Sequence, residues 1–204
     1  MNSKRANPIW LLIIIIVAVV ATCSCIKSKL QTNKTYTESY TVDAGKHYSI
    51  LSIDLIDNPL NGVIITNRSW YWPVPEKNGW SKVTGIGNEQ TGEKESNRVV
   101  YMVKDIKHDG KIKTAGIFGW YICDNGSCDN KGVPVDTIFD FDKKHKFTFE
   151  VGYTGFDKAY LVWDDKAYYE QNVSTTHGIK YLNHPYIGGT YTIPHDWNVN
   201  IKFN

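Results

Sequence analysis

Short runs of alternating apolar and polar residues make up most of this chain, and they constrain its fold more than any other feature. The clearest run is 145–153, where Phe147, Phe149 and Val151 alternate with lysine, threonine and glutamate. A period of two residues places the apolar side chains on one face of a β-strand. After residue 30, no stretch carries the apolar spacing of a helix over three turns. The chain is therefore predicted to be all-β.

Turn clusters rich in Gly, Asn, Asp and Pro separate these runs, as at 57–62 and 108–111. About nine or ten short strands at such spacing are typical of a β-sandwich or jelly roll. We expect a single antiparallel β-sandwich domain, of the jelly-roll type, over residues 31–204. The main predicted strands are 36–42, 48–56, 63–66, 98–106, 112–122, 145–153, 158–163, 167–170 and 197–203.

Residues 1–30 have the pattern of a targeting segment. Lys4 and Arg5 precede an unbroken apolar run at 9–21, which is short for a membrane-spanning helix and typical of a signal sequence. Three outcomes stay open: a cleaved secretory signal, an uncleaved membrane anchor, or a bacterial lipoprotein signal. Each of them predicts that the domain works outside the cytoplasm, and the last two attach it to a membrane.

A lipidation site is a candidate within that segment. The stretch 20–23, Val-Ala-Thr-Cys, resembles a lipobox, in which two small residues precede the cysteine that carries the lipid. Thr22 departs from the usual glycine, alanine or serine at its position, and Cys25 offers a second imperfect match. Cys23, or alternatively Cys25, is the predicted acylated residue.

Two further cysteines, Cys123 and Cys128, lie within the predicted domain. A metal site needs more ligands than this pair supplies, and an oxidising compartment favours a disulfide between them. The loop that they close is short, so the predicted role of the bond is to fix that loop.

Charge and aromatic content narrow the choice of partner. The formal net charge of +2, with basic residues scattered along the chain, argues against nucleic acid. Aromatic residues make up 13% of the chain, which favours packed β-structure or a surface for ring stacking. A Trp-Tyr-Trp run on a strand cannot point all its rings inward. The residues predicted to stack on a sugar are Trp70, Tyr71, Trp72, Trp80, Tyr168 and Tyr169, whereas Trp120, Trp163 and Trp197 are predicted to be core.

The C-terminal part, 145–204, resembles the concanavalin A-like lectin/glucanase superfamily, which includes laminin-G-like modules. The resemblance is carried by FTFEVGYTG at 147–155, AYLVWDDKAYYEQ at 159–171, PYIGG at 185–189 and PHDWNVNI at 194–201. It implies a jelly-roll sandwich that binds or degrades a glycan, often with the help of Ca²⁺. The candidate calcium ligands are Asp124, Asn125, Asp129 and Asn130.

Catalytic motifs on this fold are harder to find in the sequence. A glycosidase needs two facing carboxylates, for which only Asp140 with Asp142, or Glu150 with Glu170, are candidates. A polysaccharide lyase needs a Tyr or His base and a cation or amide for the uronate carboxylate. The candidate residues for a lyase site are Gln171, His177, Tyr181, His184, Tyr186 and His195.

The sequence therefore favours a membrane-tethered, extracytoplasmic, carbohydrate-binding module without catalysis. The alternatives are a glycan-degrading enzyme on the same fold, either lyase or hydrolase, and an envelope or adhesion protein that binds a protein partner. Two facing carboxylates or a His–Tyr pair would favour the enzyme, and exposed rings would favour the lectin.

Overall fold

The computed structural model divides the chain into two compact units, of which one is the domain Tyr36–Phe203. The other consists of Met1–Thr35 with Asn204, and the predicted targeting segment lies there, outside the described residues. Among the residues described, no helix has the length and apolar character needed to cross a membrane. The structure describes residues 35–49, 55–56, 58–73, 79–87, 95–128, 132–155, 157–174, 181–188 and 192–204.

The first of two sheets has six strands in the order β1-β12-β2-β8-β9-β10, all antiparallel. The last strand of the chain inserts between the first two, so that Val199 pairs with Tyr40 and Ile201 with Ile64. The strands are β1 (Tyr36–Val42), β2 (Leu60–Ile65), β8 (Lys146–Thr154), β9 (Lys158–Trp163), β10 (Ala167–Asn172) and β12 (Trp197–Phe203).

The second sheet follows the order β11-β3-β4-β5-β6, and β7 pairs with β5 as well. Its centre is the long hairpin of β4 and β5, which turns at Asp109 and Gly110, both with positive φ. The strands are β3 (Ser81–Gly87), β4 (Ser96–His108), β5 (Lys111–Asp124), β6 (Ser127–Cys128), β7 (Val133–Ile138) and β11 (Tyr181–Asn183), and one 3₁₀ turn, η1 (Arg68–Trp70), follows β2.

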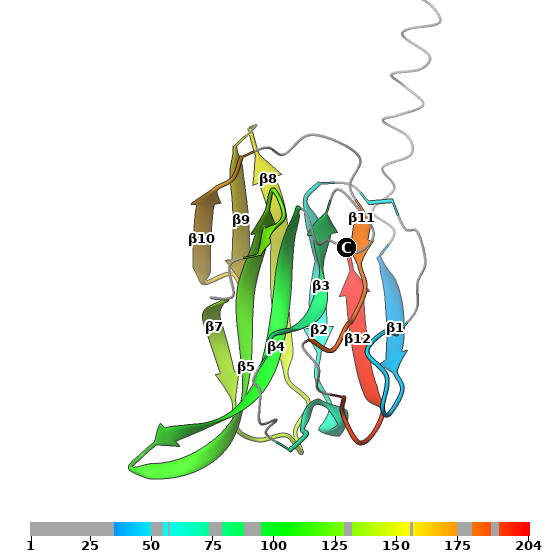
Figure 1. Ribbon diagram of the computed structural model, residues 1–204, viewed down its shortest axis with the longest axis vertical. Coiled ribbons are helices and arrows are strands. Elements are labelled where there is room, and N and C mark those ends of the chain that lie inside the picture. Colours follow the sequence, from blue (N-terminus) through cyan, green and yellow to red (C-terminus); the bar gives the residue numbers. More distant parts are fainter. Residues whose placement is uncertain are drawn as a thin grey trace, which may run out of the picture. The chain divides into compact units, whose positions relative to one another are not determined.

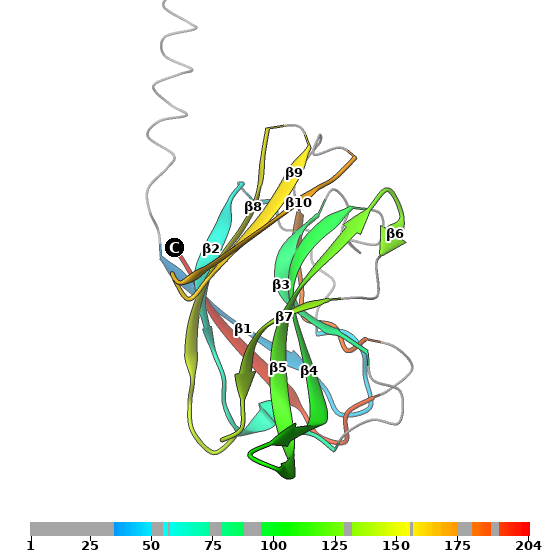
Figure 2. The same cartoon turned by 90° about the vertical axis from the view of Figure 1, so that its left-hand side faces the viewer.

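The two sheets form separate layers (Figures 1 and 2), and the core lies between them. In β8, Phe147, Phe149 and Val151 are buried while the residues between them are not fully buried, as their alternation predicts. In β12, Trp197 and every second residue after it are buried in the same way. The side chains predicted to be core, Trp120, Trp163 and Trp197, are all buried.

These observations confirm the fold class predicted from the sequence. The domain is an all-β antiparallel sandwich of the jelly-roll type, whose crossovers carry the chain repeatedly between the layers. The predicted hairpin over 98–122 is also present, although both of its strands extend further than the apolar pattern indicates.

Candidate active site

The prediction that Trp70 or Trp72 stacks on a sugar is wrong. The two residues are 0% and 2% exposed. The Trp70 ring packs 5.0 Å from Tyr101 and 5.3 Å from Trp197, and its indole nitrogen donates a hydrogen bond to the carbonyl oxygen of Asn198. The fold is more stable with such large rings buried against other aromatics than with the rings exposed to solvent. Tyr71 is the ring of this run that turns outward, and it packs on Phe141.

The other predicted stacking residues do not share one surface. Trp80 lies over the second sheet, because a Cβ at Gly119 would come within 2.7 Å of its ring. Tyr168 is 59% exposed on the outer face of the first sheet, where it stacks 6.0 Å from Tyr160. Tyr169 points the other way and packs 6.1 Å from the buried Trp120. The six aromatics therefore do not form a single binding platform.

The predicted disulfide is present, between Cys123 in β5 and Cys128 in β6. Next to it, the carboxylate of Asp124 accepts hydrogen bonds from the backbone nitrogen and hydroxyl of Ser174. Among the described residues, no three or more His, Cys, Asp or Glu side chains gather as metal ligands would. Asn125 forms the turn after β5, whereas the candidate ligands Asp129 and Asn130 lie outside the described residues. Calcium binding stays a prediction.

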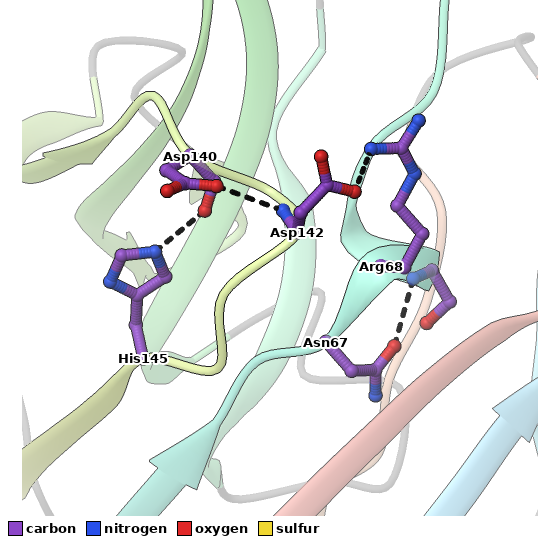
Figure 3. Close-up of polar contacts among 6 residues, drawn as sticks. Asn67, Arg68, Asp140, Asp142 and His145 are labelled. Atoms are coloured by element: carbon purple, nitrogen blue, oxygen red, sulfur yellow. Dashed lines mark hydrogen bonds and ion pairs between the residues drawn. The ribbon is translucent and has the colours of Figure 1, made fainter.

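The first candidate carboxylate pair, Asp140 and Asp142, is engaged in local contacts (Figure 3). Asp142 forms an ion pair with Arg68, while Asp140 accepts from the backbone nitrogen of Asp142 and pairs with Lys143. The contact with Lys143 lowers the pKa of Asp140. A glycosidase acid must instead stay protonated. This pair therefore lacks the arrangement of a hydrolase.

The second pair, Glu150 and Glu170, lies on the outer face of the first sheet. Glu150 accepts from the hydroxyl of Tyr160 at 2.8 Å, and Glu170 accepts from Tyr168 and from Lys158 at 2.7 Å. The bond from Lys158 lowers the pKa of Glu170. Asp140 and Glu170 thus each lie beside a lysine that lowers the carboxyl pKa, whereas the acid of glycoside hydrolysis must stay protonated.

A different set of polar residues comes together on the outer face of the second sheet. In β4, Asn97 points toward the first sheet, because its amide nitrogen donates to the carbonyl oxygens of Gly152 at 2.8 Å and Tyr160 at 2.9 Å. Since side chains alternate along a strand, Arg98 must point to the opposite, outer face.

Arg98 belongs to a row that crosses four strands. Asn183 of β11 pairs with Gly85 of β3, Gly85 pairs with Arg98, and Arg98 pairs with Tyr121 of β5. Adjacent strands lie about 4.8 Å apart, so these side chains occupy one short stretch of the outer face. We call these four residues the Arg98 row.

The guanidinium of Arg98 is held in place from two sides. It lies over the ring of Tyr121, 5.7 Å from the ring centre, and one of its nitrogens donates to the sulfur of Cys123 at 3.1 Å. The residue is only 5% exposed. A buried cation is costly unless anionic or polar groups compensate it, and such groups gather at functional sites.

Asn183 is the second unusual member of the row. It is 2% exposed, and neither its amide nitrogen nor its amide oxygen has a hydrogen-bond partner. Its neighbour Leu182 is in the core, so Asn183 points to the outer face. The residue between it and Arg98 in the sheet is Gly85, which has no side chain, and a Cβ there would collide with the carbonyl oxygen of Asn97. Buried polar atoms normally have partners, so this amide is an exception in the described part of the chain and is able to bind a group that enters the row.

A second cluster lies one row away on the same face. Lys82 pairs with Val100, which occupies the position two residues after Arg98. The ammonium group of Lys82 lies 5.0 Å from the ring centre of Tyr186, and Tyr186 in turn packs 4.7 Å from Tyr48. This face of the second sheet therefore combines two cations, an amide and several phenols.

Sequence reasoning named Tyr181 and Tyr186 as possible lyase residues but missed Arg98, Asn183 and Lys82. Tyr181 lies in β11, two residues before Asn183 and on the same face. The histidines named with them lie elsewhere: His184 packs on Tyr40, and His195 contacts the carbonyl oxygen of Ser69. Gln171 is exposed at the edge of the first sheet, and His177 lies outside the described residues.

No protein-family model and no curated protein sequence matches the chain. An alginate lyase from Pseudomonas aeruginosa is similar in structure, with 10% identity and a TM-score of 0.47; the match covers 72% of this chain but only 61% of that enzyme. An alginate lyase from a Chlorella virus matches with 12% identity and a TM-score of 0.44, covering 84% of this chain and 88% of that one. No residue role is carried over from either.

Proposed function

We propose that this domain acts on a glycan rich in uronic acid and cleaves it by β-elimination. The observation that carries the proposal is the Arg98 row, in which a buried guanidinium lies against a phenol and an unmatched amide lies two strands away on the same face. A uronate needs an opposite charge and hydrogen-bond donors at its carboxylate, and a base near its C5. The row supplies all three.

In the proposed reaction, Arg98 and Asn183 bind the carboxylate of the sugar, which makes the proton on C5 easier to remove. The phenolate of Tyr121 takes this proton, the electron pair forms the C4–C5 double bond, and the bond from C4 to the glycosidic oxygen breaks. The departing oxygen then takes the proton from Tyr121, which returns as the phenolate. The products are a chain with a new hydroxyl end and a chain ending in an unsaturated uronate.

Access to the row is part of the proposal. Arg98 and Asn183 are both buried in this state. The proposed reaction therefore needs a conformational change that exposes both side chains to the sugar carboxylate. Such opening and closing also excludes water from the reaction.

The test is an assay of the full-length protein on alginate and on other polyuronates, following the ultraviolet absorbance of the unsaturated product. Replacing the base in Tyr121→Phe should lower kcat at least about 100-fold. Arg98→Lys keeps the charge but loses the planar fork, so kcat/KM should fall as well.

The matched control is Tyr168→Phe, which removes the hydroxyl of an exposed tyrosine on the other sheet and should leave the rate within about twofold. Absence of product from every polyuronate, or full activity of Tyr121→Phe, would contradict the proposal. Binding of a polyuronate without product would instead indicate a carbohydrate-binding module. That second candidate is favoured by the contact between Lys82 and the ring of Tyr186, beside the exposed Tyr48.

The location of the protein belongs to the same proposal. The basic and apolar pattern of residues 1–30, together with the disulfide, supports a domain tethered to a membrane outside the cytoplasm. Labelling with a radioactive fatty acid should disappear in Cys23→Ser if that cysteine is acylated. Loss of label only in Cys25→Ser would move the site, and absence of label from the wild-type protein would contradict lipidation.

A further inference from the structure

The β4–β5 hairpin extends well past the body of the second sheet (Figure 1, lower left). Its last paired residues run from Lys104 with Ala115 to His108 with Lys111. Most of this segment is exposed, and Ile112, at 71%, is the most exposed large apolar residue described. A ribbon that packs so little against the core contributes little to the stability of the domain, which leaves its surface available for binding.

The ribbon has two faces of different charge. Every second residue of β4 after Arg98 lies on the same face, and Lys104 and His108 are among these residues. The residues of β5 that pair with this face of β4 include Lys111 and Lys113. Because side chains alternate strictly along a strand, these groups lie on the continuation of the face that holds Arg98. We call Lys104, His108, Lys111 and Lys113 the lysine face.

Two carboxylates of the ribbon lie near this face, one on the opposite side and one at the tip. Asp105 is on the opposite side of the ribbon, where it accepts a hydrogen bond from Thr114 at 2.7 Å. Asp109 lies in the turn, 3.4 Å from Lys113 and 3.2 Å from His108. Within the described ribbon, the lysine face thus carries three lysines, and a single carboxylate, Asp109, contacts it at its tip through Lys113 and His108.

An aromatic ring supports the lysine face near the tip of the hairpin. Phe139, which follows β7, stacks on His108 at 4.3 Å, and the ammonium group of Lys113 lies 5.7 Å from its ring centre. These contacts keep the outer part of the face in a defined position relative to the end of β7. The charges are therefore presented by a supported surface and not only by long, independent side chains.

We infer that the lysine face binds a polyanionic glycan that extends from the Arg98 row onto the ribbon. This inference rests on the proposed function for the end at Arg98. Six residues separate Arg98 from Lys104, which corresponds to about 20 Å along a strand. A uronate polymer carries a carboxylate on every sugar, so one chain can meet Arg98 and the lysines together. The lysine face therefore selects polymers over short oligomers.

The experiment compares two triple variants of the full-length protein with equal loss of charge. One is Lys104→Gln, Lys111→Gln and Lys113→Gln in the ribbon. The other is Lys144→Gln, Lys146→Gln and Lys202→Gln, all exposed and outside the ribbon. Affinity for alginate is measured at several salt concentrations, because contacts between exposed charges weaken as salt rises.

The ribbon variant should bind the polymer about tenfold more weakly and with a shallower dependence on salt, whereas the control variant should change less than about twofold. Cleavage of short uronate oligomers should be the same in both. An equal loss in the two variants, or no loss in the ribbon variant, would overturn the inference. So would a ribbon variant that keeps its affinity for alginate but loses affinity for anionic lipid vesicles.

The two proposals fail in different ways. If the wild-type protein binds alginate but forms no product from any polyuronate, the lyase proposal fails while the difference between the two triple variants still tests the ribbon. If product forms equally fast from polymer and short oligomer in the wild-type protein and in the ribbon variant, the lyase stands and the lysine face has no role.

Discussion

A guanidinium nitrogen of Arg98 donates to the sulfur of Cys123 at 3.1 Å, so the disulfide and the candidate site touch each other. The sulfur lies on the outer face of β5, beside the position that Arg98 occupies in β4. The Cys123–Cys128 bond therefore does more than close a short loop: it also forms part of the surroundings of the buried cation.

Removing the disulfide should lower both stability and activity. In the chain-entropy model a loop this short contributes about 2 kcal/mol, so Cys123→Ala with Cys128→Ala should reduce the free energy of unfolding by that amount. The measurement is urea unfolding, with the wild-type protein under reducing conditions as the comparison. Activity on a polyuronate should also fall under conditions where the variant is folded, because Arg98 loses a contact. Unchanged activity would show that the sulfur does not position the guanidinium.

Asn97 joins the two sheets through a buried set of hydrogen bonds. Its amide nitrogen donates to two carbonyl oxygens of the first sheet, and its oxygen accepts from the indole of Trp120 at 2.7 Å. Asn97→Ala leaves all three partners unmatched, at about 1–3 kcal/mol each. We expect the free energy of unfolding, measured in urea, to fall by at least about 3 kcal/mol. Asn172→Ala, at the exposed end of β10, should cost less than about 0.5 kcal/mol. Similar losses in the two variants would contradict the bridging role.

Trp70 and Tyr168 should respond in opposite ways to truncation. Trp70→Ala removes a fully buried ring and should cost about 3–5 kcal/mol, with no specific effect on glycan binding. Tyr168→Ala removes an exposed ring and should change the free energy of unfolding by less than about 1 kcal/mol. Urea unfolding of both variants checks this. A small cost at Trp70 would mean that its ring is not part of the core.

The sequence pattern was sufficient to predict the sheets but not the site. Alternation identifies Phe147, Phe149 and Val151 as one face of a strand without any knowledge of the partner strand, because the period is a local property. The Arg98 row depends instead on the register of four strands, which brings Asn183 beside a residue 85 positions earlier in the chain. Register is set by tertiary packing and turn geometry, so the row could not be predicted from the sequence pattern.

The errors at Trp70 and Trp72 have a local reason. Trp70 ends the 3₁₀ turn η1, so this run is not the strand that the prediction assumed. Trp70 and Trp72 are both buried, and Tyr71 between them is half-buried against Phe141. The alternation rule for strands therefore did not identify an exposed ring here. One signal for the candidate site was present, since only three arginines occur in the chain and Arg98 lies at the start of an apolar strand. A cation inside such a strand is rarely buried without a function.

Buried tyrosines should make the domain sensitive to alkali. Burial raises the pKa of Tyr101 and of Tyr153, and burial together with the hydrogen bond to Glu150 raises the pKa of Tyr160. In the unfolded chain these phenols ionise near pH 10, while in the folded chain they keep their protons. Above about pH 10 the unfolded state therefore binds fewer protons than the folded state, and stability falls as pH rises.

Tyr153→Phe isolates one of these phenols. Near neutral pH the variant and the wild-type protein should differ little in urea midpoint beyond a constant offset, because Tyr153 is protonated in both states. Above about pH 10 the wild-type protein should lose up to about 1.4 kcal/mol per pH unit more than the variant, which has no proton to release on unfolding at this position. The gap should then stop growing once the pH passes the raised pKa of the folded state. A difference between the two proteins that stays constant from neutral to alkaline pH would mean that the Tyr153 phenol ionises equally easily in the folded and unfolded chains, and the burial argument would fail.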